Sequence, residues 1–123
     1  MYTIRGAITV KQNKKELISE AVKVLINKII KTNKLKDEDI ISFIFSTTED
    51  LNRVYPGQAV RELGFTKTSI MCLQEMFVKD SLKKCIRVMV FVNNNLKKDE
   101  IKHIYLKKAA DLRKDLNYPL KEE

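Results

Sequence analysis

Five polar residues with the chemistry to bind or stabilise charge fall on segments that the sequence predicts to be β-strands: Arg5, Cys72, Gln74, Glu75 and Arg87. A guanidinium group in a partly buried strand requires a carboxylate, a phosphate or an anionic ligand as its partner. The strands supply few carboxylates to match these arginines, so the excess of fixed positive charge indicates an anionic small-molecule ligand. A purely structural alternative is an ordinary cross-strand salt bridge, because Glu75 and Arg87 flank the turn between two predicted strands.

Cys72 could act as a nucleophile, but no histidine base lies within predictable reach, and a small buried residue is the alternative. Cys72 and Glu75 are three residues apart, so a regular strand places their side chains on opposite faces. A shared pocket requires a bulge, or the end of the strand, between them. The only histidine, His103, lies in a lysine-flanked stretch and is predicted to be a surface residue.

The residue inventory excludes several other kinds of site. Two cysteines, Cys72 and Cys85, and one histidine cannot build a typical four-ligand zinc site. Three glycines cannot form a glycine-rich phosphate loop, and no Ser-His-Asp set is evident. We therefore expect a site without a metal or a cofactor, and two free thiols.

Hydrophobic periodicity predicts the elements that position these residues. Strands are expected at 3–10, 40–46, 69–78 and 85–92, and helices at 13–32 and 56–63. Asn13 and Glu16 resemble a capping box, and Gly64 is a natural residue to end the second helix. Residues 99–112 fit a helix, with a short strand at 104–106 as the alternative. The prediction is an α+β chain in βαβαββ order: one domain over 1–116 and a polar tail at 117–123.

Charge and hydropathy limit the partners. The net charge is +8, which raises the question of nucleic-acid binding, but the lysines are spread along the chain and mixed with acidic residues. No apolar run approaches the roughly 18–20 residues of a membrane span, and the N-terminus lacks the pattern of a signal peptide. We expect a cytoplasmic protein that binds neither nucleic acid nor membranes.

The last predicted strand bears on assembly. Both faces of residues 85–92 are largely apolar, yet only one long helix is predicted to cover the sheet. A sheet covered on one side needs a partner on the other, and the simplest partner is another copy of the chain.

With these features the sequence resembles the AroH-type chorismate mutases, a family of small monofunctional enzymes. The matching stretches are IRGAITV at 4–10, PGQAVREL at 56–63, CLQEM at 72–76, LKKCIRVMV at 82–90 and IKHIYLKKAADLRKDL at 101–116. The resemblance implies a mixed sheet packed on a long helix, and a homotrimer whose sheets form the core of a pseudo-α/β barrel. It implies active sites at the subunit interfaces, with chorismate as substrate and prephenate as product.

The resemblance also assigns roles on the strands. Arg87 matches the arginine that contacts the ether oxygen of chorismate, and Glu75 the glutamate that accepts a hydrogen bond from the ring hydroxyl. Cys72 matches a cysteine near that hydroxyl, as a contact and not a nucleophile. Arg5 and Tyr105 match residues that bind the substrate carboxylates.

Further roles are implied around the mouth of the site. Arg61 matches a charged residue from the partner subunit, and Arg113 a C-terminal arginine near the pocket mouth. Tyr55 and Gly57 match loop positions of the partner that close on the ligand. Gln58 stands where related enzymes can have a lysine, which would remove one positive charge.

The activity implied is a pericyclic Claisen rearrangement, an isomerisation in aromatic amino acid biosynthesis that needs no acid, base, nucleophile or cofactor. The protein must hold the reactive conformer of a dianion and stabilise negative charge that grows on the ether oxygen. There are two rival hypotheses. Against a non-enzymatic trimer that binds anionic metabolites stands the presence of both Glu75 and Arg87. A basic nucleic-acid-binding domain would need clustered Lys and Arg interleaved with exposed aromatics, and the sequence lacks this pattern.

Overall fold

The computed structural model describes residues 1–95 and 97–117. The five strands and two α-helices follow one another as β1 (Tyr2–Thr9), α1 (Lys15–Thr32), β2 (Ile40–Thr47), α2 (Pro56–Glu62), β3 (Ser69–Gln74), β4 (Cys85–Val92) and β5 (Ile104–Leu106). Three short 3₁₀ helices lie at Asp37–Asp39, Lys98–Glu100 and Lys107–Asp111. The predicted tail at 117–123 lies outside the described residues except for Asn117.

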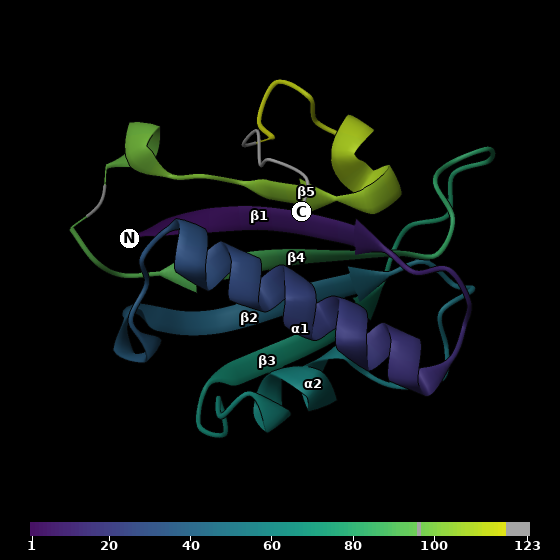
Figure 1. Cartoon of the computed structure of the whole chain (residues 1–123), viewed down its shortest axis with the longest axis horizontal. Helices are drawn as coiled ribbons and strands as arrows, with labels where there is room; N and C mark the ends of the chain where they lie inside the picture. The colour runs from purple at the N-terminus through teal and green to yellow at the C-terminus, as the bar shows by residue number, and fades with distance from the viewer. Residues whose placement is uncertain (96, 118–123) are drawn as a thin grey trace.

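The strands form one mixed sheet in the order β3-β2-β4-β1-β5 (Figure 1). The central strand, β4, is antiparallel to both of its neighbours, whereas β3 and β5 at the edges run parallel to β2 and β1. The prediction of an α+β fold is confirmed, with a fifth strand added to the expected order. A mixed sheet, which the resemblance implied, is also found.

Helix α1 covers one face of the sheet because its apolar residues recur at helical spacing and point to that face. Its buried residues pack against the inward side chains of β1, β2 and β4, and together they form the main core. Gly6 on β1 permits this approach: a Cβ atom there would lie 2.7 Å from Cδ1 of Ile29 on α1. At this distance a larger residue would force the Ile29 side chain or its surroundings to shift.

Helix α2 packs beside α1 against β3, so two helices rather than one long helix cover the sheet (Figure 1). Pro56 opens α2, and Gly64 follows the C-cap residue Leu63 with a φ of 108°, a conformation that suits glycine. The prediction for Gly64 is therefore confirmed.

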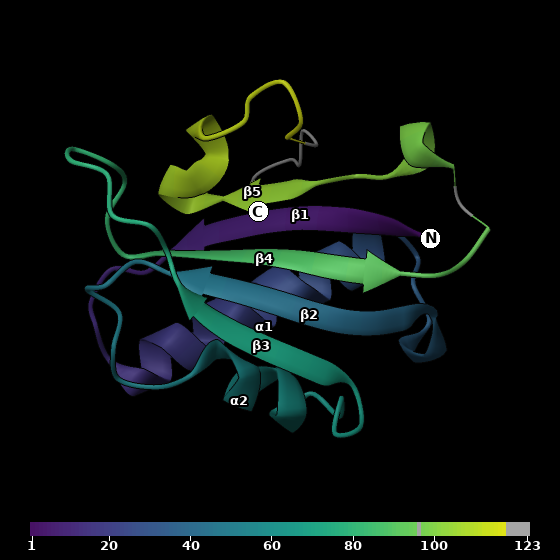
Figure 2. The same ribbon diagram turned by 180° about the vertical axis from the view of Figure 1, so that it is seen from behind.

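The opposite face of the sheet carries no helix over β2, β3 and β4 (Figure 2). The large apolar side chains of Met71, Leu73 and Met89 are exposed. Only the β1–β5 side is covered, by a small cluster in which Tyr105 and Ala109 pack on Ala7 and Cys85. We call the face of the sheet that lies opposite α1 and α2 the open face.

Three predictions about the elements are wrong. Strand β3 ends at Gln74 and not near residue 78. Residues 99–112 do not form an α-helix, because Ile104–Leu106 pair with β1 as the alternative strand. Asn13 does not cap α1; its side-chain Nδ2 donates to Oδ1 of Asn52 (2.7 Å), and its side-chain Oδ1 accepts from the backbone N–H of Asn52 (3.1 Å).

Candidate active site

A row of residues crosses the open face at the position of Arg87. Arg87 on β4 lies opposite Ser46 on one side and Ala7 on the other, and Ala7 lies opposite Tyr105. Arg5 lies on the same face two residues before Ala7, diagonal to Arg87 and within reach of long side chains. The strand pattern thus gathers Arg5, Arg87 and Tyr105 on one surface.

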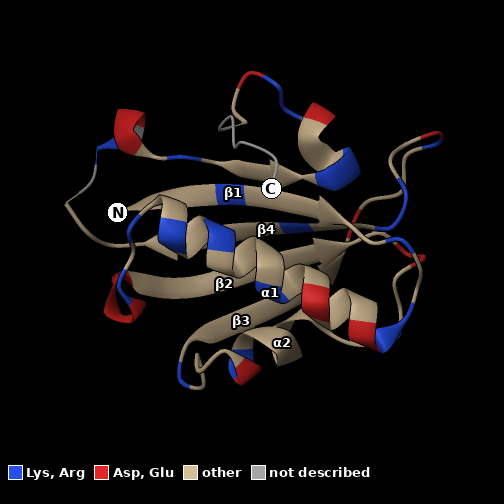
Figure 3. Cartoon of the chain, viewed as in Figure 1, with Lys and Arg blue, Asp and Glu red and all other residues tan. Residues whose placement is uncertain are grey.

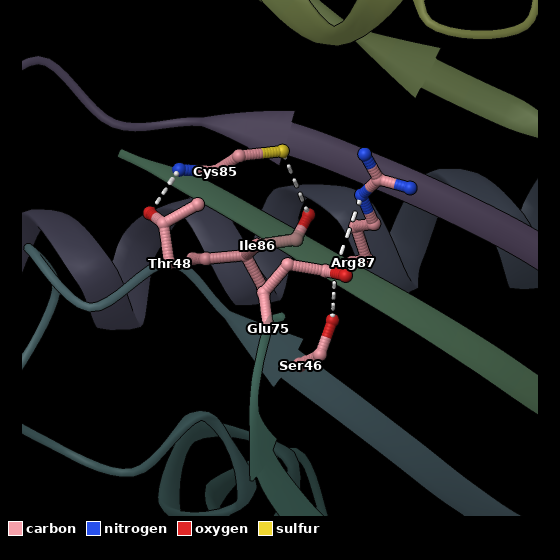
Figure 4. Close-up of polar contacts among 6 residues, drawn as sticks. All are labelled: Ser46, Thr48, Glu75, Cys85, Ile86 and Arg87. Atoms are coloured by element: carbon pink, nitrogen blue, oxygen red, sulfur yellow. Dashed lines mark hydrogen bonds and ion pairs between the residues drawn. The ribbon is translucent and has the colours of Figure 1, made fainter. Parts of the chain in front are cut away.

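Glu75 joins this surface from just beyond the end of β3. Its backbone N–H donates to the carbonyl of Thr47 (2.8 Å), which continues the β2–β3 pairing by one residue. Its Oε1 lies 3.4 Å from Nε of Arg87 and accepts a hydrogen bond from the Ser46 hydroxyl (2.6 Å), as Figure 4 shows. Because β2 lies between β3 and β4, the two residues are not the direct cross-strand neighbours that the sequence suggested.

Hydrogen bonds at the start of β4 hold the backbone just before Arg87 in place. The hydroxyl of Thr48 accepts from the N–H of Cys85 (3.0 Å; Figure 4). Both carboxylate oxygens of Asp50 accept from the N–H of Lys84 (3.0 and 3.1 Å), and Thr48 in turn donates to Asp50. The backbone that carries Arg87 is therefore tied to the loop after β2.

His103 supports Arg5 at the edge of the sheet. Its Nδ1 accepts a hydrogen bond from the backbone N–H of Arg5 (2.9 Å), which places the imidazole proton on Nε2. The side chain is half-buried, so the prediction of a simple surface residue is wrong. Burial lowers the pKa of His103, and the positive charges of Arg5 and Arg113 lower it further.

Tyr105 and Arg113 differ in exposure. Tyr105 is 8% exposed within the small cluster on the open face, so little of its surface is left for a ligand. Arg113 lies at the surface, where its Nε and Nη2 donate to the two carboxylate oxygens of Asp115 (3.1 and 2.8 Å). This hydrogen-bonded pairing lowers the pKa of Asp115 and raises that of Arg113.

Four predicted site residues lie elsewhere. The pairing of β2 with β3 has no bulge, so Cys72 faces α2, away from Glu75. Gly57 is buried in the first turn of α2 and not in a loop; a Cβ atom there would lie 3.4 Å from Sγ of Cys72 and 3.5 Å from Nη1 of Arg61. Tyr55, just before α2, is 73% exposed. These residues form a second set, Tyr55, Gly57, Arg61 and Cys72.

A groove of about 550 Å³ lies beside the second set. Its lining includes Tyr55, Gln58, Cys72, Gln74 and Arg53. A separate cleft of about 440 Å³ lies beside Glu75 and is lined by the segment from Glu75 to Lys83. Within one chain Glu75 therefore lines one hollow, whereas Tyr55 and Cys72 line another.

Sequence reasoning missed Ser46 and the Thr48–Asp50 pair. Ser46 is the next-to-last residue of β2, a largely apolar strand. Its alternation with Phe43 and Phe45, which face the core, places it on the open face. That alternation was a usable signal. The partner of its hydroxyl was not predictable, because Glu75 is 29 residues away.

Charged residues elsewhere are mixed. Figure 3 shows Lys and Arg on α1, in the loops and within β1 and β4, interleaved with Asp and Glu. Among the described residues no cluster of three or more His, Cys, Asp or Glu side chains could hold a metal ion. Over the same residues no helix is long and apolar enough to cross a membrane.

Comparison with known proteins identifies the family. A family model for chorismate mutase type I matches residues 1–116. Chorismate mutase AroH of Bacillus subtilis (strain 168) is 46% identical over 115 residues, which cover 93% of this chain and 91% of that protein. Chorismate mutase AroH of Thermus thermophilus is 36% identical over 114 residues, covering 92% and 93%.

A solved structure agrees with these sequence matches. The chorismate mutase from Clostridium thermocellum superimposes with a TM-score of 0.87 at 43% identity, covering 89% of this chain and 97% of that chain. Similarity in sequence and in fold thus extends over nearly the whole length of each relative. The chain belongs to the chorismate mutase type I family.

Proposed function

We propose that this chorismate mutase isomerises chorismate to prephenate in clefts that two copies of the chain build together. The observation that carries the proposal is the Arg87–Glu75 pair, held by β2 and β4 at the centre of the open face beside Arg5. A pericyclic rearrangement moves no proton to or from the enzyme, so the side chains need only bind, orient and stabilise charge.

Arg87 is the residue that stabilises charge on the ether oxygen. Its Nε faces Glu75, while the terminal nitrogens point away from that carboxylate (Figure 4). A guanidinium stays protonated at any physiological pH and presents its donors in a fixed plane. One such preorganised donor lowers the barrier by about 3–4 kcal/mol when the site excludes water.

The remaining residues bind and orient the dianion. Glu75 accepts a hydrogen bond from the ring hydroxyl, and Arg5, Tyr105 and Arg113 attract and hold the carboxylates. These contacts fix the compact conformer in which the bond-forming carbons meet. The carboxylate contacts of Arg5, Tyr105 and Arg113 act on ground state and transition state alike, so their main effect falls on KM.

The exposure of Arg87 supports a site shared between subunits. Its side chain is 49% exposed and that of Glu75 is 31% exposed in a single chain. Water at this exposure weakens electrostatic stabilisation, so a second copy must cover the pair for it to act strongly. That copy supplies the second set, Tyr55, Gly57, Arg61 and Cys72, which cannot reach Glu75 within its own chain.

A homotrimer is the assembly that we propose, with its sheets forming the core of a pseudo-α/β barrel. Exposed apolar side chains on the open face and in the segment after β3 favour burial against another copy: Met71, Leu73, Met76, Phe77 and Met89. Light scattering should give about three times the 14.3 kDa of one chain. A stable monomer at micromolar concentration would contradict the proposal.

The setting of the enzyme follows from the same proposal. We place it in the cytoplasm, where its two thiols stay reduced. The mixture of acidic and basic side chains argues against a nucleic-acid partner.

A chorismate-loss assay on the purified protein tests the activity. The absorbance of chorismate should decay with saturation kinetics, and treatment with a chelator should leave the rate unchanged. Binding of chorismate without turnover would instead indicate a module that only binds anionic metabolites.

A further inference from the structure

Ser46 occupies a distinctive place between the two residues of the proposed catalytic pair. It lies on β2, between β3 and β4, directly opposite Arg87. Its Oγ donates to Oε1 of Glu75 at 2.6 Å, and this same oxygen lies 3.4 Å from Nε of Arg87 (Figure 4). A distance of 2.6 Å is typical of a hydroxyl that donates to a charged carboxylate.

We infer that Ser46 is a positioning residue for the rearrangement: its hydroxyl holds Oε1 of Glu75 so that the carboxylate cannot close on Arg87 with both oxygens. This inference rests on the proposed function, in which Arg87 and Glu75 contact chorismate.

The physical reason lies in the geometry that arginine and carboxylates prefer. Left unrestrained, the two groups tend to form two parallel hydrogen bonds. Here their nearest contact joins Oε1 to Nε and not to a terminal nitrogen, and the approach of 3.4 Å is longer than a short charge-assisted bond. A two-point pair would engage a terminal nitrogen of Arg87 that the ether oxygen needs.

The same hydrogen bond leaves the other carboxylate oxygen of Glu75 available. Within the described part of the chain, Oε1 receives both the Ser46 hydroxyl and the Arg87 contact, and Oε2 receives no hydrogen bond. Ser46 thus divides the functions of the carboxylate: one oxygen is anchored to the sheet and the other faces the substrate.

Removal of the hydroxyl tests the inference. Ser46→Ala should lower kcat about tenfold, equivalent to about 1.4 kcal/mol, and change KM less. Ser46→Thr keeps the hydroxyl and should restore most of the rate. The matched control is Ser42→Ala, which removes a hydroxyl from the same strand and the same face, opposite Phe91, and should leave kcat unchanged.

A double-mutant cycle shows whether Ser46 acts through Glu75. In a Glu75→Gln background, Ser46→Ala should have little further effect on kcat, because the carboxylate that it positions is gone. Equal losses in both backgrounds, or a normal kcat for Ser46→Ala beside an impaired Glu75→Gln enzyme, would overturn the inference and leave the role of Glu75 intact. A normal rate for Glu75→Gln alone would instead refute the proposed role of Glu75.

Discussion

Oε1 of Glu75 lies 3.4 Å from Nε of Arg87 although a whole strand, β2, separates the strands that bear them. Neighbouring strands lie about 4.8 Å apart, so the two backbones are roughly 10 Å apart at this point. The contact is made because Glu75 lies one residue beyond the end of β3 and its side chain reaches over Ser46. Arg87 is anchored more firmly, since β4 is the central strand and is paired on both sides.

Substitution of Arg87 should damage the transition state more than substrate binding. Arg87→Ala should lower kcat at least a thousandfold, about 4 kcal/mol, because the charge on the ether oxygen loses its partner. Arg87→Lys should also be badly impaired, since an ammonium group lacks the planar fork. Steady-state kinetics of both variants would measure these effects.

Two controls separate catalysis from folding. Arg113→Ala should raise KM more than it lowers kcat, because Arg113 holds or attracts the dianion in both states. Melting curves should show all three variants folded. An Arg87→Lys protein with a near-normal kcat and reduced thermal stability would mean that Arg87 and Glu75 form only a structural salt bridge.

Apolar periodicity along the sequence predicted the elements whose bounds depend only on neighbouring residues. β4 was placed at its observed bounds because apolar alternation is strong over all of Cys85–Val92. The third strand was predicted too long because Met76, Phe77 and Val78 are apolar, but these residues have no partner strand and are exposed. The helix predicted at 99–112 failed and the alternative strand at 104–106 formed, because Ile104–Leu106 pair with β1, a partner about a hundred residues earlier that local spacing does not identify.

The site was predicted in the same partial way. The regular-strand argument that set Cys72 and Glu75 on opposite faces is consistent with the structure, because β3 pairs with β2 without a bulge. Proximity of Glu75 to Arg87 was expected through a direct strand pair, which the order of the sheet excludes. Ser46 went unnoticed because its role depends on a hydrogen bond between distant segments.

Gly6 should be sensitive to the smallest enlargement. In Gly6→Ala the new Cβ would lie 2.7 Å from Cδ1 of Ile29 and 3.2 Å from the backbone oxygen of Ile104, which cannot easily move. We expect the free energy of unfolding to fall by about 1–3 kcal/mol, measured by urea denaturation at fixed protein concentration.

Gly57→Ala is a matched comparison. Its Cβ would meet Cγ2 of Ile70 at 2.9 Å, but alanine is favoured in a helix by about 1 kcal/mol, which offsets part of the clash. The loss of stability should be smaller than for Gly6→Ala. A larger loss at Gly57 would show that α2 is packed more rigidly than α1.

His103 should make stability depend on pH. Its pKa is lowered in the folded protein, so below the ordinary value of about 6.5 the unfolded chain binds more protons than the folded one. Stability is therefore fully present above about pH 6.5 and is lost as the pH falls through 6.5 towards the folded pKa. In His103→Gln the melting temperature should vary less between pH 7 and pH 5; an unchanged slope would contradict this assignment.

The two thiols should react at different rates. Cys85 is 2% exposed, and burial raises the pKa of its thiol, with the nearby Arg87 opposing the shift only in part. It therefore stays protonated and shielded at neutral pH. A thiol reagent should modify Cys72 first and Cys85 only after unfolding. Rapid modification of both thiols in the native protein would show that the start of β4 opens readily.

Subunit complementation should reveal whether each site draws on two chains. Arg87→Ala disables the set on the open face, and Arg61→Ala weakens the set beside α2, so each homotrimer should be impaired when assayed below the wild-type KM. If the two variants are unfolded and refolded together, random assembly should give about a quarter of the sites two intact sets. Activity should then exceed that of either variant refolded alone, under assay conditions in which Arg61→Ala keeps less than about one third of the wild-type rate. The control is refolding of each variant with itself, together with mixing of the folded trimers without denaturant, which should recover no activity.

Arg61 and Glu75 lie on opposite sides of the sheet within one chain. If each site nevertheless belonged to a single subunit, every site in a mixed trimer would carry one of the two substitutions and would stay defective. Mixed trimers no more active than their parents would therefore rule out the shared site.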